Sequence, residues 1–465
     1  MSQEQQNHQL GAGLKTRHLT MMGLGSAIGA GLFLGTGVGI AAAGPAVLLA
    51  YIFAGIIVVF IMQMLGELAA ARTASGSFSI YSEQAFGHWA GFSLGWLYWF
   101  MLIMVMGAEM TGAAAIMASW FGISEWIPAL VAVTFFAIVN LAAVRGFGEF
   151  EFWFAFIKIA VIIGFLIIGV LLIFGLLPGH EFVGTTHFLQ EGFMPHGISG
   201  VAAGLLAVAF AFGGIEIVTI AAAESEHPAH NVAVAVRSVI WRISVFYIGS
   251  VLVICFLLPF DSIQGAETAA ESPFTKVLAL ANFPGIVGFM EAVIVLALLS
   301  AFNAQIYATS RVAHSLAERG DAPRMFAATN HSGVPMPAVL LSMVFAFLSV
   351  GLQYWNPPGL LEFLLNAVGG CLLVIWVMIG LSYLKLHPEM VRNGELTTVR
   401  MRGYPWLPIA CLVGIGIIVL LMLSDPAARL QIYAVAIIFA VLIVLSFLVR
   451  KPTGAGNAKD AAHSK

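Results

Sequence analysis

Charged residues are scarce in this sequence: Asp, Glu, Lys and Arg together make up 9% of its 465 residues. A soluble globular domain carries about 25% charged residues, so the composition excludes an ordinary soluble protein. Cysteine is scarcer still, and its three residues stand far apart at Cys255, Cys371 and Cys411. Their isolation within apolar runs predicts neither a disulfide framework nor a thiol metal site.

Long polar segments are also lacking. The widest predicted connections between apolar runs, at 177–197, 260–283, 311–335 and 385–404, are too short to hold a core of their own. The leader at 1–18 lacks the order of charged, apolar and small residues that marks a cleavable signal peptide. Any activity must therefore be carried by the apolar runs themselves.

Apolar residues, in contrast, make up 60% of the chain, and the mean hydropathy is +0.97. A helix needs about 20 apolar residues to cross a bilayer, and twelve runs approach that length. The sequence therefore predicts an all-α polytopic membrane protein with twelve transmembrane helices. The predicted spans are 19–42, 45–70, 88–118, 125–143, 149–176, 198–222, 236–259, 284–310, 336–353, 358–384, 405–423 and 429–449.

Lysine and arginine predict the orientation. If the N-terminus is cytoplasmic, seventeen of these residues fall on the inner side and only Lys276 and Arg429 on the outer side. This positive-inside bias places both termini in the cytoplasm and the chain in the cytoplasmic (inner) membrane. The predicted division is a cytoplasmic tail at 1–18, a transport core at 19–384, two further helices at 405–449 and a cytoplasmic tail at 450–465.

Two of the predicted spans are weakened by glycine. The first contains "GLGSAIGAGLFLGTG" (23–37), although a glycine inside a helix costs roughly 0.5–1 kcal/mol relative to alanine. The sixth contains "AFAFGGIEIVTIAAAE" (209–224), with two adjacent glycines ahead of Glu216. Interruptions at corresponding positions of two halves are typical of a transporter binding site. For the first span alone, small residues that let helices pack closely are an equal explanation.

The same segments resemble a known family. "GLGSAIGAGLF", "AFAFGGIEIVTIAAAES", "SVIWRISVFYIGS" and "NAQIYATSRVAHSLAERGDAP" resemble the amino acid transporter family of bacterial permeases, in the amino acid–polyamine–organocation superfamily. "GAEMTGAA" (107–114) and "FGGIE" (212–216) look closest to permeases for aromatic amino acids. "IEIVTIAAAES" with "WRISVFY" is also similar to the γ-aminobutyrate permease, so that substrate stays open.

The resemblance implies a LeuT-like fold: two inverted repeats of five helices, broken first and sixth helices, and two extra helices. It further implies secondary active import of an amino acid driven by a proton gradient, with no resident cofactor. Symport and exchange both remain possible, and the oligomeric state is not predicted. No nucleic-acid partner is expected, and no histidine pair has metal-ligand spacing within a span.

Broken helices expose backbone groups that can hold both ends of an amino acid. Free N–H groups and the positive helix end favour a carboxylate, and the resemblance places the ammonium on carbonyls of the two breaks. The predicted carboxylate site comprises Ser26, Ala27, Gly29, Ala30 and Gly31, and the predicted ammonium site comprises the carbonyls of Ile28, Phe210, Ala211 and Gly213.

The side chain of the substrate needs a pocket of its own. Aromatic and sulfur-containing side chains suit an aromatic ligand, although most of the 35 phenylalanines and 19 methionines must face lipid or core. Glycines leave room for a ring. The predicted pocket residues are Met104, Met106, Phe210, Phe212, Gly213, Gly214, Ile215 and Phe302.

Three charged residues lie deep within predicted spans, where such residues are rare and usually functional. Glu109 is predicted to carry the proton or contact the substrate, or to form a structural bond between helices. Glu216 is predicted to carry the proton, or to cap the broken sixth helix. Lys158, the only lysine or arginine deep within a predicted span, takes by resemblance the place of a coupling sodium ion; it either exchanges the proton or stays a permanent ammonium. Ser300 and Asn303 could line the cavity or bond the first span.

Other classes of function fit less well. A channel needs a continuous polar path and repeated filter segments, and an intramembrane enzyme needs converging nucleophile, base or metal groups. The acids at membrane depth are single and scattered, so no enzymatic activity is predicted. A scaffold or receptor role is disfavoured because no segment resembles a signalling domain.

Overall fold

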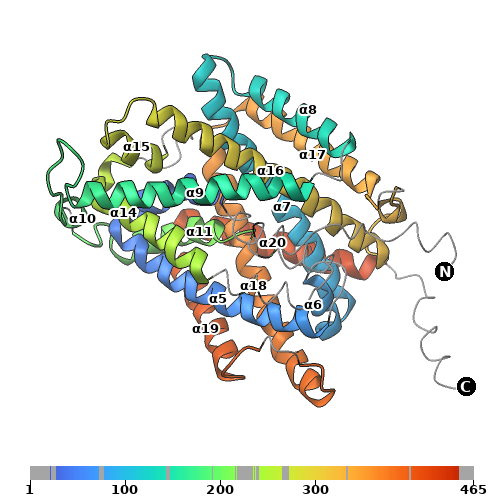
Figure 1. The fold of residues 1–465 in the computed structure, drawn as a ribbon. Helices are drawn as coiled ribbons and strands as arrows, with labels where there is room; N and C mark the ends of the chain where they lie inside the picture. The colour runs from blue at the N-terminus through green and yellow to red at the C-terminus, as the bar shows by residue number, and fades with distance from the viewer. Residues whose placement is uncertain are drawn as a thin grey trace, which may run out of the picture.

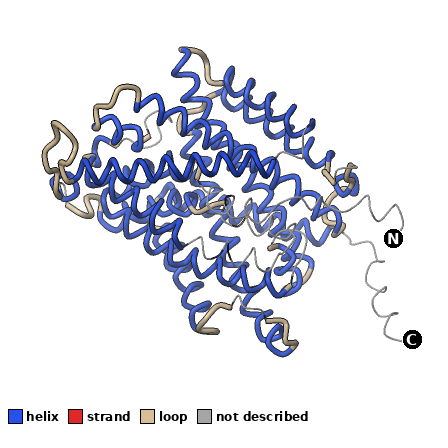
Figure 2. Tube along the Cα trace, viewed as in Figure 1, coloured by secondary structure: helices blue, strands red, loops and turns tan. Residues whose placement is uncertain are grey.

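The computed structural model describes most of the chain, and the described part consists of helices joined by turns and loops (Figures 1 and 2). No strand occurs within it. The described residues are 21, 28–72, 78–142, 147–190, 192–214, 216, 234, 236, 240–263, 272–330, 333–396 and 400–449.

Helices occupy each of the predicted spans. In the first half they are α3 (Ala30–Phe33), α4 (Gly35–Ala43), α5 (Val47–Ala71), α7 (His88–Phe121), α8 (Trp126–Ala142) and α9 (Phe147–Ile173). In the second half they are α11 (Gly197–Ala211), the π-helix η2 (Arg242–Ile248), α14 (Gly249–Leu257), α16 (Ile286–Glu318), α17 (Met336–Trp355), α18 (Leu360–Arg392), α19 (Trp406–Met422) and α20 (Pro426–Leu448). Among the described residues, seven helices are long and apolar enough to cross a membrane, and four shorter apolar helices accompany them.

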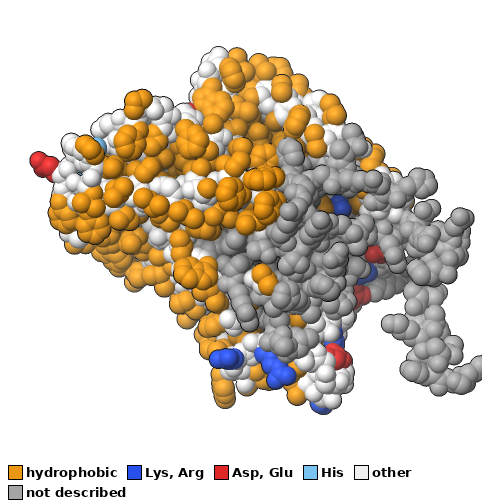
Figure 3. All heavy atoms as spheres, viewed as in Figure 1, with side chains coloured by type: hydrophobic (Ala, Val, Ile, Leu, Met, Phe, Trp, Pro, Cys, Tyr) orange, Lys and Arg blue, Asp and Glu red, His pale blue; other side chains and the backbone are white. Residues whose placement is uncertain are grey.

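The helices divide into central and peripheral ones. In α7 and α18, 78% of the most apolar stretch is buried inside the protein, against 28% in α9 and 11% in α20. The outward side chains of α9, such as Trp153 and Phe156, are large, apolar and exposed. Apolar side chains cover much of the face seen in Figure 3, while Lys and Arg side chains gather near one end of it. Such a surface is suited to lipid.

The first interruption lies inside the predicted span 19–42. Helix α3 begins at Ala30, with the extended Gly29 as its N-cap, and Leu34 separates it from α4. Gly44, with a φ of +62°, turns the chain into α5. Residues 22–27 lie outside the described part of the chain.

The second interruption is at the end of α11. The N–H groups of Phe212 and Gly213 bond to carbonyls three residues earlier, so the α-helix tightens and stops. Gly214 then has a φ of +87°, a conformation that side-chain-bearing residues rarely adopt. The two glycines of this break therefore end the helix in the middle of a predicted span.

Two helices extend farther than the hydropathy predicts. Helix α16 continues past 310 to Glu318, and α18 continues past 384 to Arg392, so that Arg311 lies inside a helix rather than in a loop. Hydropathy falls where charged residues begin, but Ala, Leu, Arg and Glu are good helix formers. The predicted loops also hold short helices: α6 (Ser79–Phe86), α10 (Thr186–Leu189) and α15 (Pro273–Leu280).

The extension of α18 is tied to the end of α5. Buried Glu67 accepts hydrogen bonds from the Tyr383 hydroxyl at 3.0 Å and from the Met401 N–H at 2.6 Å. Arg72 forms ion pairs with Glu389 at 3.0 Å and Glu395 at 2.7 Å. The predicted inner ends of these helices are thus joined by charged and polar contacts.

Candidate functional site

The two interrupted helices touch each other at Gly31. A Cβ atom at this position would lie 2.7 Å from the Cα of Ala211 and 3.2 Å from the ring of Phe210. A backbone atom cannot move aside as a flexible side chain can, so glycine is what allows α3 and the end of α11 to approach this closely. The first and sixth predicted spans therefore meet at their weak points.

Glu109 of α7 binds the beginning of α3. Its two carboxylate oxygens lie 3.1 and 3.0 Å from the backbone nitrogen of Ala30, which donates to them. This N–H belongs to the first residue of the helix and has no partner within it. Glu109 is 4% exposed, and a Cβ at Gly29 would collide with its carboxylate. A buried acid thus occupies the backbone donor that the sequence assigns to a substrate carboxylate.

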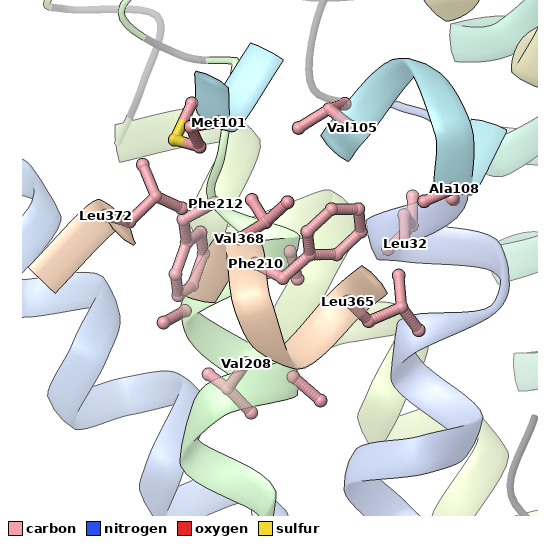
Figure 4. Packing of buried hydrophobic residues seen from close by; sticks show 14 of the residues in the cluster. Leu32, Met101, Val105, Ala108, Val208, Phe210, Phe212, Leu365, Val368 and Leu372 are labelled. Atoms are coloured by element: carbon pink, nitrogen blue, oxygen red, sulfur yellow. The ribbon is translucent and has the colours of Figure 1, made fainter. Parts of the chain in front are cut away.

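A small cavity adjoins this contact. It is lined by Gly31, Val105, Glu109, Phe210, Ala211, Gly213 and Gln305. Its volume of about 10 Å³ is about the smallest that can hold one water molecule. Figure 4 shows the ring of Phe210 among Val105, Leu32 and Leu365, beside this point. Any amino acid bound here requires the surrounding side chains to move.

The structure brings part of the predicted site together. Gly31, Glu109, Phe210, Ala211 and Gly213 line the cavity. Ile28 and Ala30, which precede the cavity residue Gly31 in the sequence, are completely buried. Ser26, Ala27 and Ile215 lie outside the described residues.

Other predicted pocket residues do not line this cavity. Phe302 packs against Phe136 of α8, with ring centres 5.7 Å apart. Phe212 points to the opposite side from Phe210 (Figure 4) and packs on Tyr51 and Tyr247 at 5.9 and 5.2 Å. Met106 is buried and Met104 half-buried in α7, and the residue of α7 that lines the cavity between them is Val105.

Glu216 lies just after the second break. Its Oε1 accepts a hydrogen bond from the Gly214 N–H at 3.2 Å. This bond runs back to the end of α11, and the residues that a capping side chain would serve, from 217 onward, lie outside the described part of the chain. With Phe212 and Trp376 it lines a second small cavity against α5 and α18. Glu216 therefore stabilises the break whether or not it also carries a proton.

Lys158 is completely buried in α9. The charged groups that act on it are Glu151 of the same helix and Glu109 of α7. Ser300 donates to Glu151 at 3.0 Å, and Asn303 pairs with Asn140 of α8 at 2.8 Å, so neither bonds the described part of the first span.

The sequence prediction missed Gln305, which lines the cavity, and Glu151, a buried acid that acts on Lys158. Glu151 stands among aromatic residues in "FEFWFAFIK", and its signal is a separation of seven residues from Lys158, which places both on one helix face. Gln305 follows Asn303 in α16 and lines the cavity. No group of three or more His, Cys, Asp or Glu side chains able to hold a metal ion occurs in the described part of the chain.

Sequence comparisons identify the family of the chain. The model of a family described as "Amino acid permease" matches residues 18–461. The chain is 72% identical to the aromatic amino acid transport protein AroP of Corynebacterium glutamicum over 97% of its own length and 98% of the relative's. It is 40% identical to the γ-aminobutyric acid permease of Bacillus subtilis, with 94% and 93% coverage. It is 33% identical to AroP of Escherichia coli K12, with 97% and 98% coverage.

These matches span both interrupted helices, all of the buried charged residues and nearly every helix described above. The chain therefore belongs to the amino acid permease family of the amino acid–polyamine–organocation superfamily, and it is a multi-pass membrane transport protein.

Proposed function

We propose that the protein imports the aromatic amino acids phenylalanine, tyrosine and tryptophan across the cytoplasmic membrane by proton symport. The 72% identity with the C. glutamicum transporter supports the substrate class. The observation that carries the proton coupling is the bond between the Glu109 carboxylate and the Ala30 N–H.

Because of this bond, protonation of Glu109 and binding of the substrate carboxylate would affect each other. An amino acid carboxylate seated on the same N–H would lie within about 4 Å of an ionised Glu109, and two such charges repel by about 4 kcal/mol at an effective dielectric constant near 20. A proton on Glu109 removes the repulsion and weakens the hold of Glu109 on Ala30. Proton binding and substrate binding therefore favour each other, which is the requirement for symport.

The two breaks supply the remaining contacts. The substrate ammonium would rest on carbonyls at Ile28 and at the end of α11, so that both charges of the zwitterion meet dipoles instead of unpaired ions. The aromatic ring would take the space that Phe210 fills, because Gly31 and Gly213 present no side chain there. Rings in edge-to-face or offset contact gain about 0.5–1.5 kcal/mol beyond the area they bury.

The topology that accompanies this proposal is the one predicted from the sequence. Twelve spans would form two inverted five-helix repeats within 19–384, with α19 and α20 at 405–449 outside them. Both tails would lie in the cytoplasm of a chain embedded in the inner membrane. The proton gradient would be the only driving force, with no resident cofactor.

The test is uptake of radiolabelled phenylalanine into proteoliposomes with an acidic exterior. We expect accumulation that an uncoupler abolishes and that excess tyrosine or tryptophan blocks. Uptake that requires an amino acid preloaded inside would identify an exchanger, and the symport proposal would fail.

γ-Aminobutyrate is a second candidate substrate, because the B. subtilis permease named for it is more similar to this chain than E. coli AroP is. Its ammonium and carboxylate are three carbons apart, so the two poles would have to bind farther apart than those of an α-amino acid. Competition by γ-aminobutyrate without competition by tryptophan would favour this alternative.

A further inference from the structure

Glu151 is a buried acid with no part in the mechanism above. It is 2% exposed, one turn into α9. Its Oε1 accepts from Ser300 at 3.0 Å, while Oε2 has no hydrogen-bond partner among the described residues. A half-satisfied carboxylate at membrane depth is costly and is usually retained for function.

Lys158 lies on the same face of α9, seven residues farther along. Two turns of helix separate the two residues by about 10 Å along the axis, a span that a glutamate and a lysine side chain bridge when they extend toward each other. The Lys158 Nζ also lacks a hydrogen-bond partner among the described residues, and the groups that act on it electrically are Glu151 and Glu109. Lys158 thus interacts electrostatically with two carboxylates, and neither of them forms an ion pair or a hydrogen bond with its Nζ in this structure.

The surroundings contribute little other charge. Of the helices packed against α9, α14 carries no charged residue in its described part. The charged residue of α15, Lys276, donates to the Ser262 carbonyl on the predicted outer side. Helix α16 presents the neutral Ser300 to Glu151. A proton in this region therefore has Glu109, Lys158 and Glu151 to reside on.

The predicted positions of Glu109, Lys158 and Glu151 across the membrane indicate the direction in which a proton would move. Helix α9 begins at its predicted cytoplasmic end, so Glu151 lies nearer the cytoplasm than Lys158. Glu109 lies at the substrate site on Ala30. The three groups form a series that leads from the substrate site toward the inner surface.

We propose that Glu151 is the proton acceptor through which the coupling proton leaves for the cytoplasm; the inference rests on the proposed proton symport. An N–H bond of the Lys158 ammonium breaks as an O–H bond forms on Oε2 of Glu151, leaving a neutral amine and a neutral acid. The amine then takes the proton of Glu109, which regains its charge and its bond to Ala30. The acid releases its proton to cytoplasmic water, and every proton is accounted for.

The experiment compares two transport modes of E151Q in proteoliposomes. Exchange of internal for external phenylalanine at equal pH needs no net proton release, so we expect it to stay within about two-fold of the unmodified protein. Accumulation driven by a proton gradient needs the release, and we expect it to fall at least ten-fold. E151D, which keeps an ionisable carboxyl, should recover part of the accumulation.

Glu291 provides the matched control, because E291Q changes an acid that accepts from Trp120 on the outer side, away from α9. Accumulation by E151Q equal to that of the control would overturn the inference. Loss of both exchange and accumulation in E151Q and E151D alike would also overturn it, by showing a structural role. If the unmodified protein itself shows no proton-driven accumulation, the proposed function fails instead.

Discussion

At the scale of single residues, the contact between Glu109 and Ala30 is the most informative in the molecule. It places an ionisable group on the backbone donor that we propose for the substrate carboxylate. Glycine at position 29 leaves room for this contact, because a side chain there would displace the carboxylate from its present place. The chemistry of the site thus depends as much on a missing side chain as on the acid.

Glu109→Gln tests the coupling. The amide can still accept from the Ala30 N–H, but it cannot take up a proton in exchange. We expect the pH dependence of phenylalanine uptake between about pH 5 and 8 to flatten, and gradient-driven accumulation to fall at least ten-fold. Initial rates measured over that pH range decide the question; an unchanged profile would exclude Glu109 as the proton carrier.

Gly31→Ala tests the contact between the two breaks. The added methyl group would meet the Cα of Ala211 at 2.7 Å, and overpacking of this kind typically costs 1–3 kcal/mol. We expect a lower melting temperature in detergent and loss of most transport. Gly416→Ala is the matched control, since a Cβ there meets nothing within 4 Å, and it should leave both measurements unchanged. Equal behaviour of the two variants would contradict the packing argument.

Residue types could be assigned to the site from the sequence, but side-chain directions could not. Helical periodicity predicts which residues share a face only while the helix is continuous. At the second break that relation is lost, so Phe210 and Phe212 could not be assigned to opposite sides (Figure 4). Glu151 was missed because it stands among aromatic residues near the start of a predicted span. Its seven-residue spacing from Lys158 places the two on one helix face and could have indicated it.

At the scale of helices, the positions of the spans follow from hydropathy because each apolar run must bury about 20 residues in lipid. The interruptions follow from clustered glycine. The inner ends were predicted less well, since α16 and α18 run on through charged residues. The extension of α18 is held by partners distant in sequence, Glu67 and Arg72, and no local pattern indicates them.

The contact of Arg72 with the segment after α18 predicts a pH-dependent motion. The hydrogen bond from the Arg72 guanidinium holds the pKa of Glu395 below its ordinary value. The ionised carboxylate therefore stabilises the contact above the unfolded-state pKa of about 4.3, and this stabilisation is lost as the pH falls through the lower folded-state pKa.

Hydrogen exchange of residues 385–396 should therefore accelerate when the pH is lowered from 6 to below about 4, after correction for the intrinsic rate. Arg72→Gln should show the faster exchange already at pH 6, because it removes the charge that holds Glu395. Exchange that is independent of both the pH and this substitution would show that the contact does not hold the segment.

At the scale of the whole molecule, the helices form a buried central group and a peripheral group whose apolar side chains face outward. Helices α7 and α18 are largely enclosed, while α9 and α20 have most of their apolar stretch outside the protein core. Across the family, the named substrates do not follow overall identity, since a γ-aminobutyric acid permease is closer to this chain than E. coli AroP.

The orientation can be tested with introduced cysteines, because Cys255, Cys371 and Cys411 are buried. Phe182 and Met325 are exposed, at 68% and 61%, on predicted opposite sides of the membrane. We expect a membrane-impermeant maleimide to label Phe182→Cys in intact cells and Met325→Cys only after permeabilisation. The reverse pattern would invert the predicted topology.

The small cavity between the interrupted helices has a consequence for the energy supply of the cell. Protons move quickly through membranes only along connected files of water, and about 10 Å³ accommodates at most a single molecule at this point. No continuous file of water therefore passes this point in the described part of the protein. A cell could keep many copies of the permease in its membrane without a leak of protons through water at this position.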